Sequence, residues 1–153
     1  MEISCRSDIG GGPEQLFKII TNLKNVFNFY CACPDQEPYY NKIINEGVPV
    51  FKLPHRRFEI KPFLKLLKWT KINNIMIVHS HGRGAGIYAR LLKLFNKRLK
   101  VVHNFHGIHI ENKGLALIVA RFLRILKNKF VLVSRSEQQI AMKYGLASAS
   151  NCV

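Results

Sequence analysis

The segment that decides the fold runs from residue 75 to residue 95 and reads IMIVHSHGRGAGIYARLLKLF. Its first part, Ile75–Ser80, is an apolar run of strand length, and the glycine-rich stretch Gly82–Gly86 predicts a turn. A helix is expected to follow over about Ile87–Phe95, because apolar side chains recur there at helical spacing. A buried strand that passes through a glycine-rich turn into a helix is typical of a parallel α/β sheet.

Strands and helices alternate on both sides of this segment. The other predicted strands are Glu2–Arg6, Phe27–Cys33, Val48–Leu53, Lys100–Phe105 and Phe130–Ser134, and further helices are predicted from Pro13 and over residues 60–71, 114–127 and 136–144. The strands are apolar runs rather than alternations of apolar and polar residues, which is typical of strands covered on both faces. We therefore predict an α/β domain with a mostly parallel sheet of about six strands and helices on both faces.

The composition is that of one globular domain. The chain has 153 residues, long enough to build its own hydrophobic core, and 48% hydrophobic against 22% charged residues excludes a disordered chain. The longest apolar run, Leu115–Ala120, is far too short to span a bilayer. No basic segment followed by an apolar one opens the sequence, so we expect a cytoplasmic protein.

Positive charge is concentrated in the middle of the chain. The sequence contains 24 Lys and Arg against 9 Asp and Glu, a net charge of +15. From Lys52 to Lys129 there are eighteen basic residues against only Glu59 and Glu111. This excess predicts an anionic partner or surface. Because no RNA- or DNA-binding motif accompanies the charge, nucleic acid is not the partner we expect.

Basic side chains border the apolar stripes of the predicted helices. Such a cationic edge suits the anionic inner leaflet of a membrane, at about 1 kcal/mol for each Lys or Arg near the surface. We therefore expect a peripheral protein at the inner face of the membrane. The residues expected at that surface are Lys61, Lys65, Lys68, Trp69, Arg121 and Arg124.

Glycines and histidines gather where three predicted strands end. Gly10–Gly12 follow the first strand, His79–His81 end the fourth, and His106 with Gly107 end the fifth. In open parallel sheets, ligands bind at the carboxyl ends of the strands where the strand order reverses. The sequence therefore predicts a polar, glycine-lined binding edge at this end of the sheet.

The histidine pair does not indicate a metal site by itself. His79 and His81 share one face of their strand, but no carboxylate or third ligand lies close to them in sequence. Cys31 and Cys33 lack a second pair at zinc-ligand spacing and are expected to be buried free thiols. We therefore expect no metal.

Four segments of the chain resemble family 4 retaining glycosyltransferases. They are SDIGGGPEQLFKIITNL (7–23), IMIVHSHGRGAGIYARLLKLF (75–95), VVHNFHGIHIE (101–111) and FVLVSRSEQQIAMKYGL (130–146). The resemblance implies one half of a GT-B fold, in which two Rossmann-like domains face each other across a cleft. It covers the first, acceptor-side domain over residues 1–146, leaving 147–153 as an expected unstructured tail.

The second, donor-binding domain of the family has no counterpart here, and its two glutamates eight positions apart are not found. We therefore expect a truncated chain or a split subunit that works with a separate donor-domain subunit. The implied function is the acceptor side of a sugar transfer from a nucleotide-sugar to a glycan or lipid-linked acceptor in polysaccharide or lipopolysaccharide synthesis, with no cofactor. The alternative is a non-enzymatic, basic partner subunit that binds a membrane or an acceptor.

The resemblance also implies roles for residues at the predicted edge. It places the donor diphosphate at Gly11 and Gly12 and makes His106 the catalytic residue, and the acceptor side is expected to comprise Ser80, His81, Arg83 and Gly107. Each role has a purely structural alternative. The glycines could serve only to form a tight turn, His106 could be a strand-end histidine hydrogen-bonded to the backbone, and Arg83 could be a solvated loop residue. An imidazole can hydrogen-bond either a sugar hydroxyl or a phosphate at neutral pH.

Overall fold

The computed structural model describes residues 1–106, 126 and 129–152. In this part of the chain, six strands form one sheet in the order β3-β2-β1-β4-β5-β6, and every pairing is parallel. The strands are β1 (Glu2–Ser4), β2 (Cys31–Cys33), β3 (Val50–Lys52), β4 (Ile77–His81), β5 (Lys100–Asn104) and β6 (Lys129–Val131). The prediction of a mostly parallel sheet of about six strands is confirmed.

The strand order reverses beside β1. The chain runs outward from β1 through β2 to β3, then returns to place β4 on the other side of β1 and continues outward to β6. This order, 3-2-1-4-5-6, is that of a Rossmann-like sheet, and its switch point lies between β1 and β4. The carboxyl ends of these two strands therefore mark the expected ligand-binding crevice.

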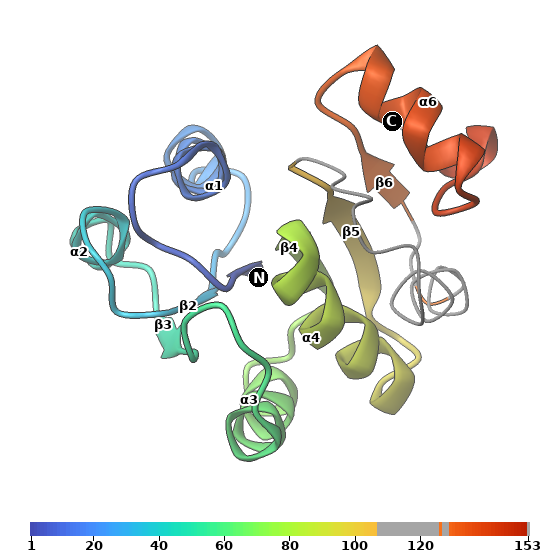
Figure 1. Ribbon diagram of the computed structural model, residues 1–153. Coiled ribbons are helices and arrows are strands. Elements are labelled where there is room, and N and C mark those ends of the chain that lie inside the picture. Colours follow the sequence, from blue (N-terminus) through green and yellow to red (C-terminus); the bar gives the residue numbers. More distant parts are fainter. Residues whose placement is uncertain (107–125, 127–128, 153) are drawn as a thin grey trace.

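Helices cover both faces of the sheet (Figure 1). The helices described are α1 (Gly11–Leu23), α2 (Tyr39–Asn45), α3 (Ile60–Ile72), α4 (Gly82–Phe95) and α6 (Arg135–Lys143), with a short 3-10 helix, η2 (Ala149–Asn151). Helices α3 and α4 bury Phe63 and Tyr88 against Ile3 and Val78 on one face. Helices α1 and α2 pack on the other face, where Leu16, Ile20 and Ile43 meet the buried thiols Cys31 and Cys33.

Helix α4 begins five residues earlier than the sequence predicts. Gly82–Gly86 form its first turns rather than a separate turn, and the helix starts directly after His81. The glycines allow the helix to dock closely: a Cβ atom at Gly86 would lie 2.7 Å from Cε1 of the buried His103. The glycine-rich pattern therefore reflects close helix–strand packing, which a sequence pattern alone does not distinguish from a turn.

The end of the chain also differs from expectation. The prediction of an unstructured tail over 147–153 is wrong for the described residues, because η2 occupies Ala149–Asn151 and Cys152 forms a parallel bridge with Phe130. Leu146 and Ala147 are buried in the apolar cluster of Phe130, which fixes the residues that follow. Helix α2 was not predicted, and the helix predicted over 114–127 lies outside the described residues apart from 126.

Among the described residues, no helix combines the length and the apolar character needed to cross a membrane.

Candidate functional site

The carboxyl ends of β1, β4 and β5 meet at one edge of the sheet. His106 follows β5 with a positive φ of 51°, a conformation that few non-glycine residues adopt. Its ring lies against the first turn of α1, where a Cβ atom at Gly12 would be 3.5 Å from Cδ2 of His106. Asn104 at the end of β5 donates a 2.6 Å hydrogen bond to Oε1 of Gln15 and ties α1 to this strand. The structure thus brings the predicted glycines and histidine together.

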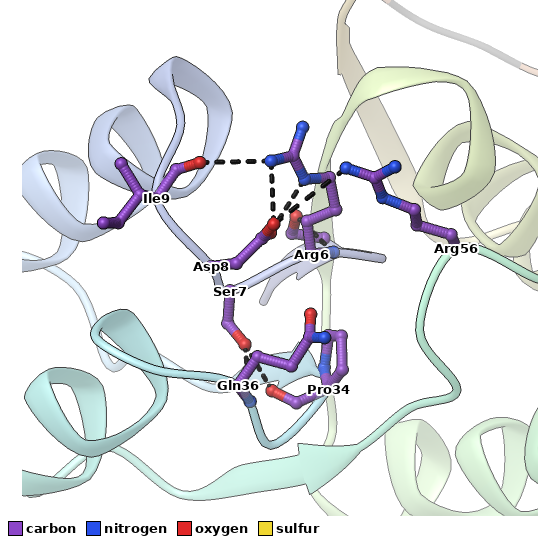
Figure 2. A network of polar contacts seen from close by, with 8 residues as sticks. Arg6, Ser7, Asp8, Ile9, Pro34, Gln36 and Arg56 are labelled. Carbon is purple, nitrogen blue, oxygen red and sulfur yellow. Dashed lines mark hydrogen bonds and ion pairs between the residues drawn. The ribbon is translucent and has the colours of Figure 1, made fainter.

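The loop from β1 to α1 is held by its own polar contacts (Figure 2). The Arg6 guanidinium donates to both carboxylate oxygens of Asp8, at 2.7 and 2.9 Å, and to the carbonyl oxygen of Ile9 at 3.1 Å. The Ser7 hydroxyl donates to the carbonyl oxygen of Pro34 at 2.6 Å, which fixes the loop to the segment after β2. These contacts set the position in which α1 begins.

The first turn of α1 offers backbone N–H groups to a ligand. The helix starts at Gly11, and Gly10, which precedes it, provides no side-chain cap. A Cβ atom at Gly11 would meet no atom within 4 Å, so the space beside this residue is open. Uncapped N–H groups at a helix N-terminus suit an anion such as a phosphate, since the helix dipole adds to their attraction.

A buried glutamate lies behind these residues. Oε2 of Glu2 is 2.7 Å from Nε2 of His81 and 3.1 Å from Nδ1 of His79. On its other side, the His81 ring places Nδ1 3.2 Å from Nε2 of His106. We call Glu2, His79, His81 and His106 the Glu2 cluster. It runs from β1 through β4 to the end of β5.

Burial and hydrogen bonding set the charges of the Glu2 cluster. Burial alone would raise the pKa of the Glu2 carboxyl, but the hydrogen bonds from His79 and His81 outweigh it and lower the pKa to about 2. Burial lowers the pKa of His81, and burial together with the nearby His81 lowers the pKa of His106 to about 4. At neutral pH the carboxylate is ionised while the rings of His81 and His106 are neutral.

Glu2, His79 and His81 also have the composition of a metal site. One ligand atom from each lies within 4.8 Å of the others. The sequence argument against a metal rested on the lack of a nearby carboxylate, and the fold supplies one from β1. Sequence reasoning missed Glu2, although a glutamate inside an otherwise apolar strand was the available indication. In the structure, however, His79 and His81 both already contact the same oxygen of Glu2 directly.

The predicted acceptor residues divide into buried and exposed. The Ser80 side chain is fully buried with its hydroxyl 2.9 Å from Nδ1 of His103, and His81 is 4% exposed. The prediction that both line an acceptor surface is therefore not met by the structure, because β4 is covered at these positions. Arg83 is exposed in the first turn of α4. Gly107 lies outside the described residues.

The predicted membrane-surface residues are only partly at the surface. Lys61, Lys65 and Lys68 are exposed on α3. Trp69 is partly buried because it packs against Tyr30 and Phe51, with ring centroids 5.4 and 5.5 Å apart, and its role at a membrane surface stays a prediction. Arg121 and Arg124 lie outside the described residues.

A cavity of about 530 Å³ opens at the opposite, amino edge of the sheet. Its lining is largely apolar and includes Leu23, Phe27, Tyr30 and Met76, while Glu2 and His79 reach it from the interior. The glycines of α1 and His106 are not part of this lining. The groups able to bind an anion or a sugar therefore converge at the carboxyl edge, away from the cavity.

A 3-2-1-4-5-6 parallel sheet with helices on both faces, whose switch point carries an uncapped helix N-terminus and a histidine, defines a Rossmann-like domain. The sequence model of the family called Glycosyltransferase Family 4 matches residues 25–152, and the chain belongs to this family. Two curated relatives from Escherichia coli, the O-antigen biosynthesis glycosyltransferase WbnH and the probable O-antigen biosynthesis glycosyltransferase WbiN, are each 27% identical to it over 145 residues. That match covers 92% of this chain and 43% of each relative.

Solved structures confirm the fold. The HepE protein of Anabaena, crystallised with UDP and glucose, matches 99% of this chain and 42% of its own length with a TM-score of 0.80 and 13% identity. A glycosyltransferase from Rickettsia africae ESF-5 matches 99% of this chain and 41% of its own length with a TM-score of 0.69 and 14% identity. The prediction of a Rossmann-like, GT-B-type domain is confirmed, and the chain spans less than half the length of these relatives.

Proposed function

We propose that this chain is the acceptor-side domain of a retaining glycosyltransferase. The complete enzyme transfers a sugar from a nucleotide-sugar to a glycan or lipid-linked acceptor of the polysaccharide or lipopolysaccharide type. The names of the relatives support this class of product, and the UDP and glucose bound to HepE support the class of donor. The observation that carries the proposal is the position of the His106 ring beside the start of α1, where a Cβ atom at Gly12 would lie 3.5 Å from Cδ2 of the ring. It joins an anion-binding helix end to a group that can hydrogen-bond a sugar.

Each residue at the carboxyl edge has a role in this proposal. The N–H groups of Gly11 and Gly12 bind the donor diphosphate, because neither residue has a side chain to obstruct a phosphate. His106 is the catalytic residue that contacts the reacting sugar. Arg83, exposed in the first turn of α4, binds a phosphate of the acceptor, for which a guanidinium is well suited. The nucleotide itself is bound mainly by the donor-binding domain.

A diphosphate should perturb the N-terminus of α1 in the isolated chain. In ¹H–¹⁵N NMR spectra, adding UDP or inorganic pyrophosphate is expected to shift the amide signals of Gly11 and Gly12. Gly11→Ala should weaken this binding about tenfold, roughly 1.4 kcal/mol, because its methyl group occupies the open space that a phosphate needs. The same methyl group meets no protein atom, so the melting temperature should not fall.

The start of α6 provides a matched control for this experiment. Ser136→Ala alters the first turn of another helix and should leave the binding of pyrophosphate unchanged. Two results would contradict the assignment of the diphosphate to Gly11 and Gly12. One is equal shifts of the amide signals at the N-termini of α1 and α6, and the other is equal binding of pyrophosphate by Gly11→Ala and the unaltered chain.

We propose further that α3 holds the domain at the cytoplasmic face of an anionic membrane. Lys61, Lys65 and Lys68 are exposed on this helix, and Ile60 and Leu64 beside them are 67% and 56% exposed. A basic surface with exposed apolar side chains suits the interface of a membrane that carries anionic lipid. This surface also favours the alternative function, a non-enzymatic subunit that binds the membrane.

Reversing the three charges should abolish most vesicle binding. Changing Lys61, Lys65 and Lys68 together to glutamate is expected to weaken binding to phosphatidylserine-containing vesicles by about a hundredfold or more, given about 1 kcal/mol for each lysine. Rising salt should weaken the unaltered chain in the same assay, since the Debye length is about 8 Å at physiological ionic strength. Vesicle co-sedimentation measures both effects, with circular dichroism as the check on folding.

The control variant carries the same change in net charge elsewhere. Lys18, Lys24 and Lys52 are exposed lysines that each pair with a carboxylate, and their joint reversal should weaken binding much less. Equal loss in the two triple variants would show that net charge, not the α3 surface, directs the chain to the vesicle. Equal binding to neutral vesicles would contradict the proposed membrane surface. Vesicle binding without any transfer, once a donor-binding domain is supplied, would support the non-enzymatic function.

A further inference from the structure

The Glu2 cluster is a continuous chain of hydrogen bonds that crosses three adjacent strands. Glu2 is paired in register with His79, and His81 lies two residues further along β4, so the three side chains share one face of the sheet. Oε2 of Glu2 accepts at 2.7 Å from His81, and the opposite nitrogen of the His81 ring is 3.2 Å from Nε2 of His106. The series of hydrogen bonds therefore ends at His106, the residue proposed to contact the sugar.

The Glu2 carboxylate determines which ring nitrogens of His81 and His106 carry a proton. An ionised carboxylate can only accept hydrogen bonds, so Nε2 of His81 must carry a proton. A neutral imidazole has one N–H, which leaves Nδ1 of His81 as an acceptor. His106 must then donate through its own Nε2. Since its ring is also neutral, Nδ1 of His106 carries no proton, and this atom has no hydrogen-bond partner among the described residues.

A metal ion would impose the opposite arrangement. Coordination through Nε2 of His81 would place the proton of that ring on Nδ1. Coordination through Nδ1 of His79 would place a proton on Nε2 of that ring, which is buried and has no acceptor in the described part of the chain. When His79 and His81 instead donate directly to Glu2, the N–H group of each ring has the carboxylate as its acceptor. The geometry therefore favours a hydrogen-bond chain over a metal site.

We propose that Glu2, acting through His81, fixes His106 in the tautomer that carries its proton on Nε2, so that His106 presents an unprotonated Nδ1 to the ligand. Glu2 and His81 are thus positioning residues. An unprotonated imidazole nitrogen accepts a hydrogen bond from a hydroxyl group but has no proton to donate to a phosphate oxygen. The ligand group at His106 is therefore a sugar hydroxyl rather than a phosphate, an inference that rests on the proposed function for the identity of the ligand.

The unaltered chain at pH 7.5 provides the first test. Two-bond ¹H–¹⁵N correlation spectra distinguish protonated from bare ring nitrogens of individual histidines. We expect one tautomer for both His81 and His106, with the proton on Nε2 in each. A protonated Nδ1 on His106, or a mixture of both tautomers, would overturn the proposal. So would a shift of the His79 and His81 nitrogens to metal-bound values when equimolar zinc is added.

Glu2→Leu provides the second test. Without the carboxylate, the one remaining partner of His81 in the cluster is His106, so the proton of His81 should move to Nδ1 and that of His106 from Nε2 to Nδ1. Both tautomers should invert, a change that a purely structural role for Glu2 would not produce. Glu46→Gln, which removes a surface carboxylate paired with Lys24, should leave both tautomers unchanged. An unchanged tautomer of His106 in Glu2→Leu would overturn the proposal, and if that variant does not fold, the spectra of the unaltered chain decide.

Transfer assays separate this inference from the proposed function. In a complete enzyme, Glu2→Leu should lower transfer about 10–100-fold, by analogy with the loss of residues that orient metal-ligating histidines. If the NMR spectra give the expected tautomers but no transfer depends on His106, the proposed function fails while the hydrogen-bond chain stands. If transfer depends on His106 but its tautomer is independent of Glu2, the positioning role fails alone.

Discussion

Replacing His106 with alanine is expected to lower sugar transfer by about 10²–10³-fold, or roughly 3–4 kcal/mol, which is the usual effect of removing one well-placed polar group that stabilises a transition state. The ring of His106 lies against the first turn of α1, where Gly12 leaves space beside it, and a strained backbone holds it there. Strain of this kind is tolerated where the surrounding structure fixes it, and it is concentrated at functional sites. Loss of the ring should therefore affect the reaction more than the fold.

The assay needs a donor-binding domain, which a chimera can supply. This chain would replace the matching part of the E. coli O-antigen glycosyltransferase WbnH, and transfer from a nucleotide-sugar to a lipid-linked acceptor would be measured. The 153-residue chain alone should give no transfer, because a reaction in a two-domain cleft needs both walls to position the donor. His55→Ala is the matched control, since His55 is exposed in the loop after β3.

Thermal melts on the same preparations separate the two roles of a strand-end histidine. A catalytic His106 gives slow transfer with a melting temperature close to that of the unaltered chimera. A structural His106 gives a lowered melting temperature and near-normal transfer in the folded fraction. The second result would remove the catalytic assignment, and with it the reason to place the reacting sugar at this edge.

The strand-and-helix order could be predicted from the sequence because it depends on local patterns. The apolar run before the glycines of 82–86 predicted β4, and the helical spacing after it predicted α4. The start of α4 could not be predicted in the same way. Gly86 is present because His103, seventeen positions later, lies where a Cβ atom would be. Contacts between distant residues of this kind leave no periodic pattern.

Only the part of the candidate site that depends on the order of strands and helices could be predicted. Gly11, Gly12 and His106 each follow a strand, so the topology alone places them at one edge. Glu2 was missed because its role depends on the register that pairs β1 with β4. Ser80 was misplaced, and the partial burial of Trp69 was not foreseen, because exposure depends on the neighbours that cover a side chain. Residue type and spacing do not determine which side chains an adjacent element covers.

Acid should destabilise the fold through Glu2. The pKa of its carboxyl is about 2 in the folded chain against 4.5 for the ordinary group, so the unfolded chain takes up a proton that the folded chain does not. The resulting stabilisation is fully present above pH 4.5 and is lost as the pH falls toward 2. For a side chain this deeply buried, the difference corresponds to about 3 kcal/mol of unfolding free energy. The lowered pKa of the buried His81 adds a loss of the same sign that begins near pH 6.5.

Urea unfolding of the unaltered chain and of Glu2→Gln, followed by circular dichroism from pH 7 to pH 2.5, measures this contribution. The glutamine variant has no carboxyl to titrate, so the advantage of the unaltered chain should be largest near neutral pH and should shrink by most of 3 kcal/mol below pH 4.5. Glu46→Gln, at a partly exposed surface pair, should run nearly parallel to the unaltered chain throughout. Parallel curves for Glu2→Gln as well would mean that the carboxyl titrates alike in both states. The hydrogen bonds from His79 and His81 would then do no more than offset the burial of the Glu2 carboxylate, and its ionisation would not stabilise the folded chain.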